Sequence, residues 1–265
     1  MHFSWHFFTH LLFSPPSSFV KGAITTVYVA VISQTLGVAV GLVLALFRRS
    51  KRMSLRTFAS GYIWLVRGTP LLVQLVLVYD GLSGLGVYSF PAISVFGISI
   101  PSVVQAGILT LSFNEGAYMA EILRAAIDSV DRGQAEAAES LGMRTGQAMR
   151  YVVLPQAMRI VIPPLGNEFN NMLKITSLLS VIGLGELFLA AQDYNSATFK
   201  TFEIFIVVAI YYIAMTTVWA VIQSAIERRL EARGGEIVEY VPLRRRLFGG
   251  GGGGVISVQE MRGVR

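Results

Sequence analysis

The chain has 265 residues, of which 53 % are hydrophobic and only 14 % are charged. A soluble domain carries about 25 % charged residues, so this composition excludes an ordinary soluble protein and predicts an all-α protein that crosses a membrane several times. The formal net charge of +6 does not indicate nucleic-acid binding, because the basic residues cluster beside the ends of apolar runs. The lack of cysteine excludes disulfides and thiolate metal sites.

Residues 1–21 form an aromatic-rich segment ahead of the first long apolar run. Aromatic rings suit the membrane–water interface, so we expect an external or interfacial segment here. His2, His6 and His10 recur every four residues and would share one face of a helix, a spacing that could hold a metal. Because no acidic residue lies near them, we favour an interfacial helix and expect no metal site.

Five apolar runs are long enough to cross a bilayer, which requires about 20 helical residues each. They cover residues 22–47, 58–82, 101–126, 160–191 and 202–226. In the first run Gly37 and Gly41 permit close helix packing. In the second, Pro70 removes a backbone donor and predicts a bend or a break. External loops are expected between the second and third runs, where Lys and Arg are absent, and over residues 193–200.

The basic residues indicate how these runs are oriented. Of the 22 Lys and Arg residues, five lie in residues 48–56, five in 124–159 and eight in 228–265. Five spans, with the N-terminus outside and the C-terminus in the cytoplasm, put all three groups on the cytoplasmic side. No even number of spans with the same boundaries does so.

The expected organisation is therefore a transmembrane domain over residues 22–229 and a cytoplasmic tail over residues 230–265. The tail is rich in charged residues and contains an unbroken glycine run at 249–254. That composition is typical of disorder.

A polar stretch over residues 128–155 interrupts the apolar chain. Asp131 is placed to cap a helix at its N-terminus, and Gly142 is placed to end that helix. Thr145 is expected to cap a second short helix, after which Pro155 begins the next element. The stretch is predicted to be a helix–glycine–helix segment that lies outside the membrane.

Within this stretch, Glu136-Ala137-Ala138 is followed by Gly142 and then by Val152-x-Leu154-Pro155. This pattern resembles the "EAA" loop of the permease subunits of ABC importers, with valine at position 152 in place of the usual isoleucine. In that family the loop forms a coupling helix that docks into a groove on a cytoplasmic ATPase subunit. The coupling residues that the resemblance implies are Glu136, Ala137, Ala138, Ser140, Leu141, Gly142 and Arg144.

Three further segments, residues 67–72, 117–124 and 173–178, resemble the importers of polar amino acids such as histidine, glutamine, glutamate and arginine. The last one departs from the family, since Ile175 stands where an acidic residue is usual. The resemblance spans about residues 21–229. It implies a type I importer permease fold in the cell membrane of a prokaryote, with a second permease subunit, two ATPases and an extracellular solute-binding protein.

The sequence carries no recognisable catalytic motif. None of the four lysines follows a glycine, so a GK[ST] phosphate loop is excluded, and there is no HExxH motif. We therefore expect that the chain is not an enzyme and binds no cofactor, and that ATP and magnesium belong to the partner ATPase.

Polar residues inside the apolar runs are the candidates for a substrate path, because an ionisable group at membrane depth is costly and by default functional. One polar stripe follows steps of three and four residues in the fourth run, a second cluster lies in the third run, and Arg67 lies at the expected helix break. The candidates are Arg67, Thr69, Asn114, Glu115, Tyr118, Asn167, Glu168, Asn171 and Lys174.

A zwitterionic ligand needs a cation for its carboxylate and acceptors for its ammonium group. Arg67 and Glu115 could supply these, or they could pair with other side chains and hold the helices together, and the sequence leaves both interpretations open. For Glu121 and Arg124 the structural interpretation is favoured. Lys174 could line the path or lie at the seam between two permease subunits.

The leading interpretation is the membrane subunit of an ATP-driven importer of a polar amino acid. A stand-alone secondary transporter or channel is the alternative, but it would need no docking loop. A membrane enzyme that uses Glu115 and Glu121 as an acid/base pair is disfavoured, because residues six apart project about 120° apart on a helix. The transported amino acid, and whether the permease pair is a homodimer or a heterodimer, stay open.

Overall fold

The computed structural model describes residues 3–95 and 97–231 of the chain. The chain divides into two compact units, Met1–Trp219 and Ala220–Arg265, and the fold and candidate site described here belong to the first. The expected tail over residues 230–265, with its glycine run, lies almost wholly outside the described residues.

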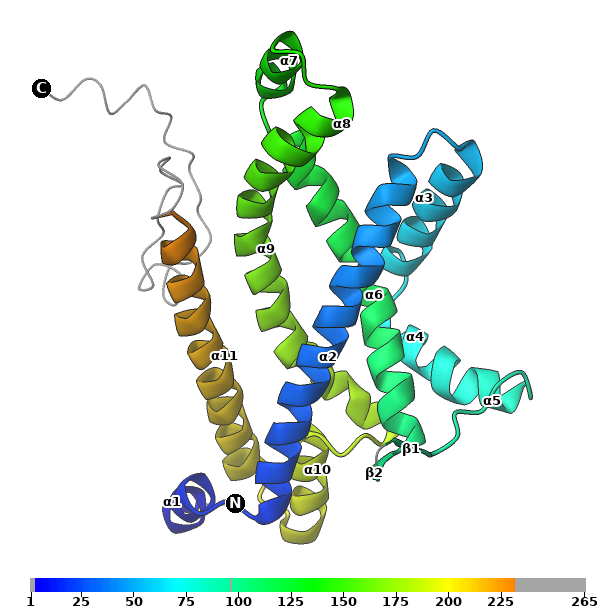
Figure 1. Ribbon diagram of the computed structural model, residues 1–265. Helices are drawn as coiled ribbons and strands as arrows, with labels where there is room; N and C mark the ends of the chain where they lie inside the picture. Colours follow the sequence, from blue (N-terminus) through cyan, green and yellow to red (C-terminus); the bar gives the residue numbers. More distant parts are fainter. Residues whose placement is uncertain (1–2, 96, 232–265) are drawn as a thin grey trace, which may run out of the picture. The chain divides into compact units, whose positions relative to one another are not determined.

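The first half of the fold is helical apart from one short hairpin (Figure 1). Its helices are α1 (Trp5–Phe13), α2 (Ser17–Arg48), α3 (Met53–Arg67), α4 (Leu71–Val76), a π-helical turn (Leu77–Gly81) and α5 (Leu82–Gly84). Strands β1 (Ile93–Val95) and β2 (Ile98–Ile100) pair antiparallel, with Ile93 opposite Ile100.

The second half begins with the long helix α6 (Ser102–Asp128), which leads into α7 (Arg132–Ser140) and α8 (Thr145–Ala148). A π-helical turn (Met149–Val153) then joins α8 to α9 (Leu154–Ile175), which tightens into a 3-10 helix (Thr176–Ile182). Helices α10 (Leu187–Thr198) and α11 (Thr201–Glu231) complete the described chain.

Two helices, Ser17–Arg48 and Thr201–Leu230, are long and apolar enough to cross a membrane, and the number rises to four if each of two bent helix pairs counts as one span. The remaining expected span, the third in the chain, corresponds to α6, which has 27 residues. By length and composition it is not among the candidate spans.

Helices α2 and α6 pack closely along much of their length, as Gly37 and Gly41 predicted. A Cβ added at Gly41 would lie 2.4 Å from Met119 Cβ, and one added at Gly37 would lie 2.6 Å from Glu115 Cβ. Since real Cβ atoms do not approach so closely, only glycine fits at these two positions.

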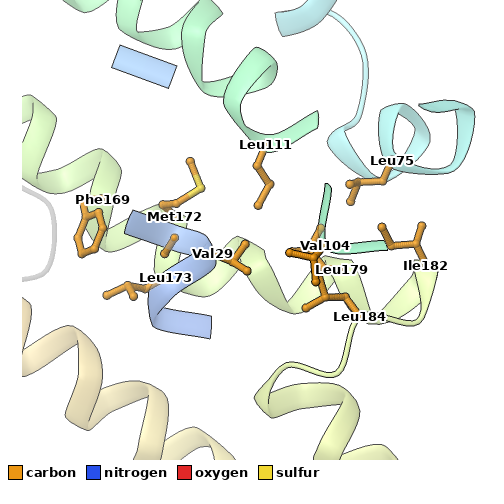
Figure 2. Close-up of a cluster of buried hydrophobic side chains, with 11 residues drawn as sticks. Val29, Leu75, Val104, Leu111, Phe169, Met172, Leu173, Leu179, Ile182 and Leu184 are labelled. Carbon is orange, nitrogen blue, oxygen red and sulfur yellow. The ribbon is translucent and has the colours of Figure 1, made fainter. Parts of the chain in front are cut away.

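The main hydrophobic core lies where α2, α4, α6 and α9 meet, together with the segment that follows α9. Figure 2 shows Val29 of α2, Leu75 of α4, Leu111 of α6 and Met172 of α9 in this cluster. The core therefore ties the short helix after the Pro70 break to the two helices that flank the polar stretch.

The N-terminal helix α1 packs against other helices of the unit. Leu11 is buried in a second core cluster with Phe19, Leu187 and Ile204, and Tyr211 donates a hydrogen bond to the Leu12 carbonyl at 2.9 Å. Residues His6 and His10 lie on α1, whereas His2 lies outside the described residues.

The second apolar run is broken as expected, but more sharply than one bent span. Helix α3 ends at Arg67, Pro70 precedes α4, and the segment Leu71–Gly84 turns by 106° from α3. Proline lacks the amide donor that a continuous helix needs. The break predicted at Pro70 is therefore confirmed, and the run expected over residues 58–82 consists of two helices at a sharp angle.

The fourth run is also broken, contrary to the continuous span expected over residues 160–191. Its helix ends at Ile182, Gly183 takes a left-handed conformation with φ of 82°, and the chain bends by 51° into α10. Glycine adopts this conformation without the steric cost that other residues meet. The external loop expected over residues 193–200 is helical up to Thr198.

Candidate functional site

The EAA loop, residues 128–155, begins with the predicted cap and glycine stop. Asp131 Oδ1 accepts a hydrogen bond from the Gly133 amide at 2.7 Å. Gly142 has φ of 87°, and the amide of Met143 donates to the Ala138 carbonyl at 3.1 Å. This is the bonding pattern of a glycine-terminated helix, so both predictions are confirmed.

The second half of the EAA loop differs from the expectation. The N-cap residue of α8 is Arg144, not Thr145, and its amide donates to Gln147 Oε1 at 2.9 Å. The helix also does not stop before Pro155, but continues through a π turn in which the Leu154 amide bonds to the Met149 carbonyl. The wider turn accommodates the missing amide of Pro155.

All but one of the predicted coupling residues are exposed to solvent. Ala138 is buried, whereas the others are exposed, and Leu141 is 85 % exposed. The inner side of the loop rests on the buried residues Val130, Val153 and Ala157. The EAA loop therefore has a packed base and an open outer face.

A glutamine that sequence reasoning missed ties the helix break together. Gln74 Nε2 donates to the Val66 carbonyl and to Thr69 Oγ1, both at 2.8 Å. Its Oε1 atom accepts a hydrogen bond from Asn114 Nδ2 at 3.0 Å. One side chain thus joins the end of α3, the start of α4 and the middle of α6. Its position as a lone amide within an apolar run was the available signal.

Glu115 faces α2, away from the helix break. Its side chain is buried, with 3 % of the residue exposed, and Oε1 accepts a hydrogen bond from Gln34 Nε2 at 2.9 Å. Gln34 was also missed, although it is a polar residue in the middle of the first apolar run. This contact joins the two helices whose glycines allow the close approach.

Arg67 lies over the ring of Tyr118, with 5.2 Å between the guanidinium carbon and the ring centroid. The charge of Glu168 on α9 interacts with that of Arg67 and with that of Glu115. Residues from α3, α6 and α9 therefore place one cation over an aromatic ring, with a partly exposed carboxylate within the range of its charge. We call Arg67, Tyr118 and Glu168 the charged cluster.

The remaining candidates on α9 point elsewhere. Asn167, Asn171 and Lys174 are exposed on this helix, at steps that place them on one face. Lys174 lines a cavity of about 290 Å³ with Ser177 and Tyr212. Within the described chain, the structure does not bring Lys174 into the charged cluster.

A larger cavity of about 490 Å³ lies in the bend between α3, α4 and α6. Its lining is mostly apolar and includes Leu65, Val73 and Phe113. Thr69 and Gln74 contribute polar atoms, but no charged side chain lines it. The cavity and the charged cluster are therefore separate features of the same helix break.

Glu121 and Arg124 have the structural role that the sequence favoured. Arg48 on α2 pairs with Glu121 on α6, and Arg124 pairs with Glu121 at 3.0 Å and with Asp128 at 2.8 Å. The ion pairs join α2 to the end of α6, next to the EAA loop.

A third missed residue, Glu186, fixes the start of α10. It is fully buried. Its carboxylate accepts hydrogen bonds from the amides of Phe188 at 2.8 Å and Leu189 at 2.7 Å, and from the Tyr212 hydroxyl at 2.9 Å. Ser, Thr, Asp and Asn are the usual N-cap residues, so a glutamate cap gives little signal in a sequence.

The chain is similar to known proteins in both sequence and fold. The family model described as binding-protein-dependent transport system inner membrane component matches residues 37–232. The chain is 40 % identical over 205 residues to the "Probable amino-acid permease protein YxeN" of Bacillus subtilis, covering 77 % of this chain and 88 % of that protein. It is 36 % identical to the arginine transport system permease protein ArgU of Corynebacterium glutamicum, covering 86 % and 72 %. Among solved structures, an amino acid ABC transporter crystallised with histidines matches at 41 % identity and a TM-score of 0.75, covering 85 % of this chain and 99 % of that one.

Proposed function

The chain belongs to the family of binding-protein-dependent transport system inner membrane components, and we propose that it is the membrane subunit of an ATP-driven importer that carries a polar amino acid. The similarity to an amino-acid permease, an arginine permease and an amino acid ABC transporter supports this substrate class. Dependence on a binding protein, which the family description states, disfavours a stand-alone transporter or channel.

The exposed outer face of the EAA loop is the observation that carries the coupling part of the proposal. Leu141 and Glu136 are open to a partner, while Ala138 holds the loop to its own base. We assign the docking of a cytoplasmic ATPase to Glu136, Ala137, Ser140, Leu141, Gly142 and Arg144, with Ala138 as the packed side of the same helix. ATP and magnesium would bind to that partner, and none of the chemistry of hydrolysis falls to this chain.

The EAA loop is continuous with α6 on one side and with α9 on the other. A displacement of the loop when the ATPases close would therefore act on α6 and α9, two of the three helices that contribute to the charged cluster. This is the type of rigid-body switching by which packed helices alternate between two arrangements.

The charged cluster is the proposed contact for the amino acid. Arg67 would bind the substrate carboxylate, because a guanidinium offers paired donors in a geometry that matches two carboxylate oxygens. Glu168 would accept from the ammonium group, and the Tyr118 ring would hold the Arg67 side chain in place. Thr69, Asn114, Glu115, Asn167, Asn171 and Lys174 stay secondary candidates for the path.

The proposed arrangement has five spans, with α6 counted as the third, the N-terminus outside and residues 230–265 in the cytoplasm. Placing α6 in the membrane is consistent with its burial, because Asn114 and Glu115 face other helices and have partners there. A second permease subunit and an extracellular solute-binding protein complete the proposed complex in a prokaryotic cell membrane.

The test is reconstitution of the chain with its ATPase and binding protein in lipid vesicles, adding amino acids one at a time. We expect vanadate-sensitive ATP hydrolysis to be stimulated by one polar amino acid. Failure of any ATPase to associate with the chain would contradict the proposal, and stimulation by a non-amino-acid solute alone would contradict the substrate class.

A further inference from the structure

An open, basic cavity of about 450 Å³ lies at the turn between α2 and α3. Four arginines line it, together with two hydroxyl groups, one carboxylate and one methionine: Arg48, Arg49, Arg56, Arg124, Thr57, Ser60, Asp128 and Met53. The EAA loop follows directly on the end of α6, which contributes Arg124 to this cavity. The cavity is distinct from the charged cluster, and it meets the EAA loop only at the loop's first residue, Asp128.

The arginines of the cavity outnumber the carboxylates that pair with them. Glu121 pairs with Arg48 and Arg124, and Asp128 pairs with Arg124 at 2.8 Å and more loosely with Arg49 at 3.8 Å. Two carboxylates thus face four guanidinium groups, which leaves a surplus of positive charge. Such a site has a net attraction for anions.

Arg56 carries the clearest part of this surplus. Among the hydrogen bonds of the described residues, its guanidinium group donates only to the Met53 sulfur, at 2.9 Å, and a thioether is a weak acceptor. Its side chain is exposed and lines the cavity. A phosphate group is the ligand that matches such a guanidinium, because it offers several strong acceptor oxygens and a full negative charge.

The surface next to the cavity indicates which kind of phosphate-containing molecule would bind there. Arg56, Ser60 and Trp64 follow one another at steps of four residues, so they lie along one face of α3. Along this face, the charge of Arg56 is followed by the hydroxyl of Ser60 and then by Trp64, which is 77 % exposed. Leu65, the residue after Trp64, is also more than half exposed. A charged end followed by an apolar strip matches a phospholipid, with its headgroup in the cavity and its acyl chains along α3.

We infer that this cavity binds the headgroup phosphate of an anionic phospholipid, and that Arg56 is its main contact. Basic pockets between membrane helices on the cytoplasmic side are suited to such headgroups. The proposed orientation puts the cavity on that side, whereas binding itself depends only on the cavity and the strip. The exposed tryptophan next to the cavity favours a lipid over an acidic protein surface or free phosphate, neither of which needs Trp64.

The test is native mass spectrometry of the full chain in a neutral detergent, titrated with dioctanoyl phosphatidylglycerol, with dioctanoyl phosphatidylcholine and with inorganic phosphate. We expect saturable binding of phosphatidylglycerol, and weaker binding of the other two. Arg56→Gln should weaken phosphatidylglycerol binding about fivefold, the effect of one basic residue at an anionic surface. Arg56→Lys, which keeps the charge, should lose less.

The matched control is Arg52→Gln. Arg52 precedes α3 by one residue, is exposed, and does not line the cavity, so its loss removes the same charge without changing the site. Ser60→Leu is a second variant that keeps every charge and fills the cavity, and it should also weaken binding of phosphatidylglycerol.

Three results would overturn the inference. The first is an equal loss of binding in Arg52→Gln and Arg56→Gln, which would mean unspecific attraction to net charge. The second is inorganic phosphate binding as tightly as phosphatidylglycerol. The third is an unchanged lipid affinity in Arg56→Gln together with loss of ATPase capture, which would make the cavity a protein contact.

Discussion

The EAA loop and the helix break at Pro70 are held in opposite ways. In the EAA loop the decisive contacts are local, such as the bond from Gly133 to Asp131 and the turn at Gly142. At the break, Gln74 and Asn114 are 40 residues apart in the sequence. A segment held by local contacts can move as a unit, whereas a joint held by distant contacts fixes helices against one another.

The largest effect is expected where one side chain holds the break. Gln74→Ala leaves the Val66 carbonyl and the Asn114 amide without their partner, and an unsatisfied buried polar group costs about 1–3 kcal/mol. We expect the free energy of unfolding of the purified chain to fall by about 2 kcal/mol in denaturant titration. Gln192→Ala, at an exposed position on α10, is the control. Equal stability of the two variants would show that the break is not held by Gln74.

The next effect concerns the turn of the EAA loop. Gly142→Val forces a branched residue into a left-handed conformation, at a cost of about 1–2 kcal/mol. Nothing lies within 4 Å of a Cβ added there, so the strain is purely conformational. We expect transport by the reconstituted complex to fall about tenfold, with normal membrane insertion.

The matched control for this variant is Gly146→Val. Gly146 also has open space around an added Cβ, but its backbone is helical. Normal transport in Gly142→Val, or an equal loss in Gly146→Val, would contradict the role of the left-handed turn in coupling.

A smaller effect separates the two glutamates near the break. Glu168→Gln removes the accessible carboxylate of the charged cluster, and we expect the half-saturating amino-acid concentration to rise about fivefold, the loss of one charge-assisted hydrogen bond. Glu115→Gln should change it less, because an amide oxygen can still accept from Gln34. The measurement is the dependence of ATP hydrolysis on amino-acid concentration. The reverse order of effects would make Glu115 the substrate contact.

The smallest effect is expected at Tyr118. Tyr118→Leu removes the ring under Arg67, a contact of about 0.5–1 kcal/mol, so we expect two- to fivefold weaker stimulation by the amino acid. Tyr118→Phe keeps the ring and should behave like the unaltered chain. A loss in Tyr118→Phe equal to that in Tyr118→Leu would assign the role to the hydroxyl group instead.

Sequence reasoning succeeded where the physical cause is local. The Asp131 cap, the Gly142 turn and the Pro70 break each follow from one residue and its neighbours. The prediction of a continuous span over residues 160–191 was wrong because its break depends partly on a residue that is distant in the sequence. Its break depends on Gly183, which tolerates a left-handed turn, and on Glu186, which caps α10 and accepts a hydrogen bond from Tyr212 of a later helix.

The residues of the candidate site could be predicted from the sequence, but the contacts between them could not. Polar residues at membrane depth identified Arg67, Tyr118 and Glu168 as candidates, yet nothing in the sequence paired Arg67 with Tyr118. Gln34 and Gln74 were missed because single amides in apolar runs carry no motif. Their role depends on which helix packs opposite them, and only the fold determines that.

The most direct test of the account is whether the outer face of the EAA loop is covered by the ATPase. Since the chain has no cysteine, Leu141→Cys and Ser196→Cys each introduce a single thiol at an exposed position. We would measure maleimide labelling of each thiol with and without the ATPase subunit. The account predicts that the ATPase blocks labelling at position 141 and leaves position 196 reactive. Equal labelling at position 141 in the free chain and in an assembled complex would contradict docking through the EAA loop.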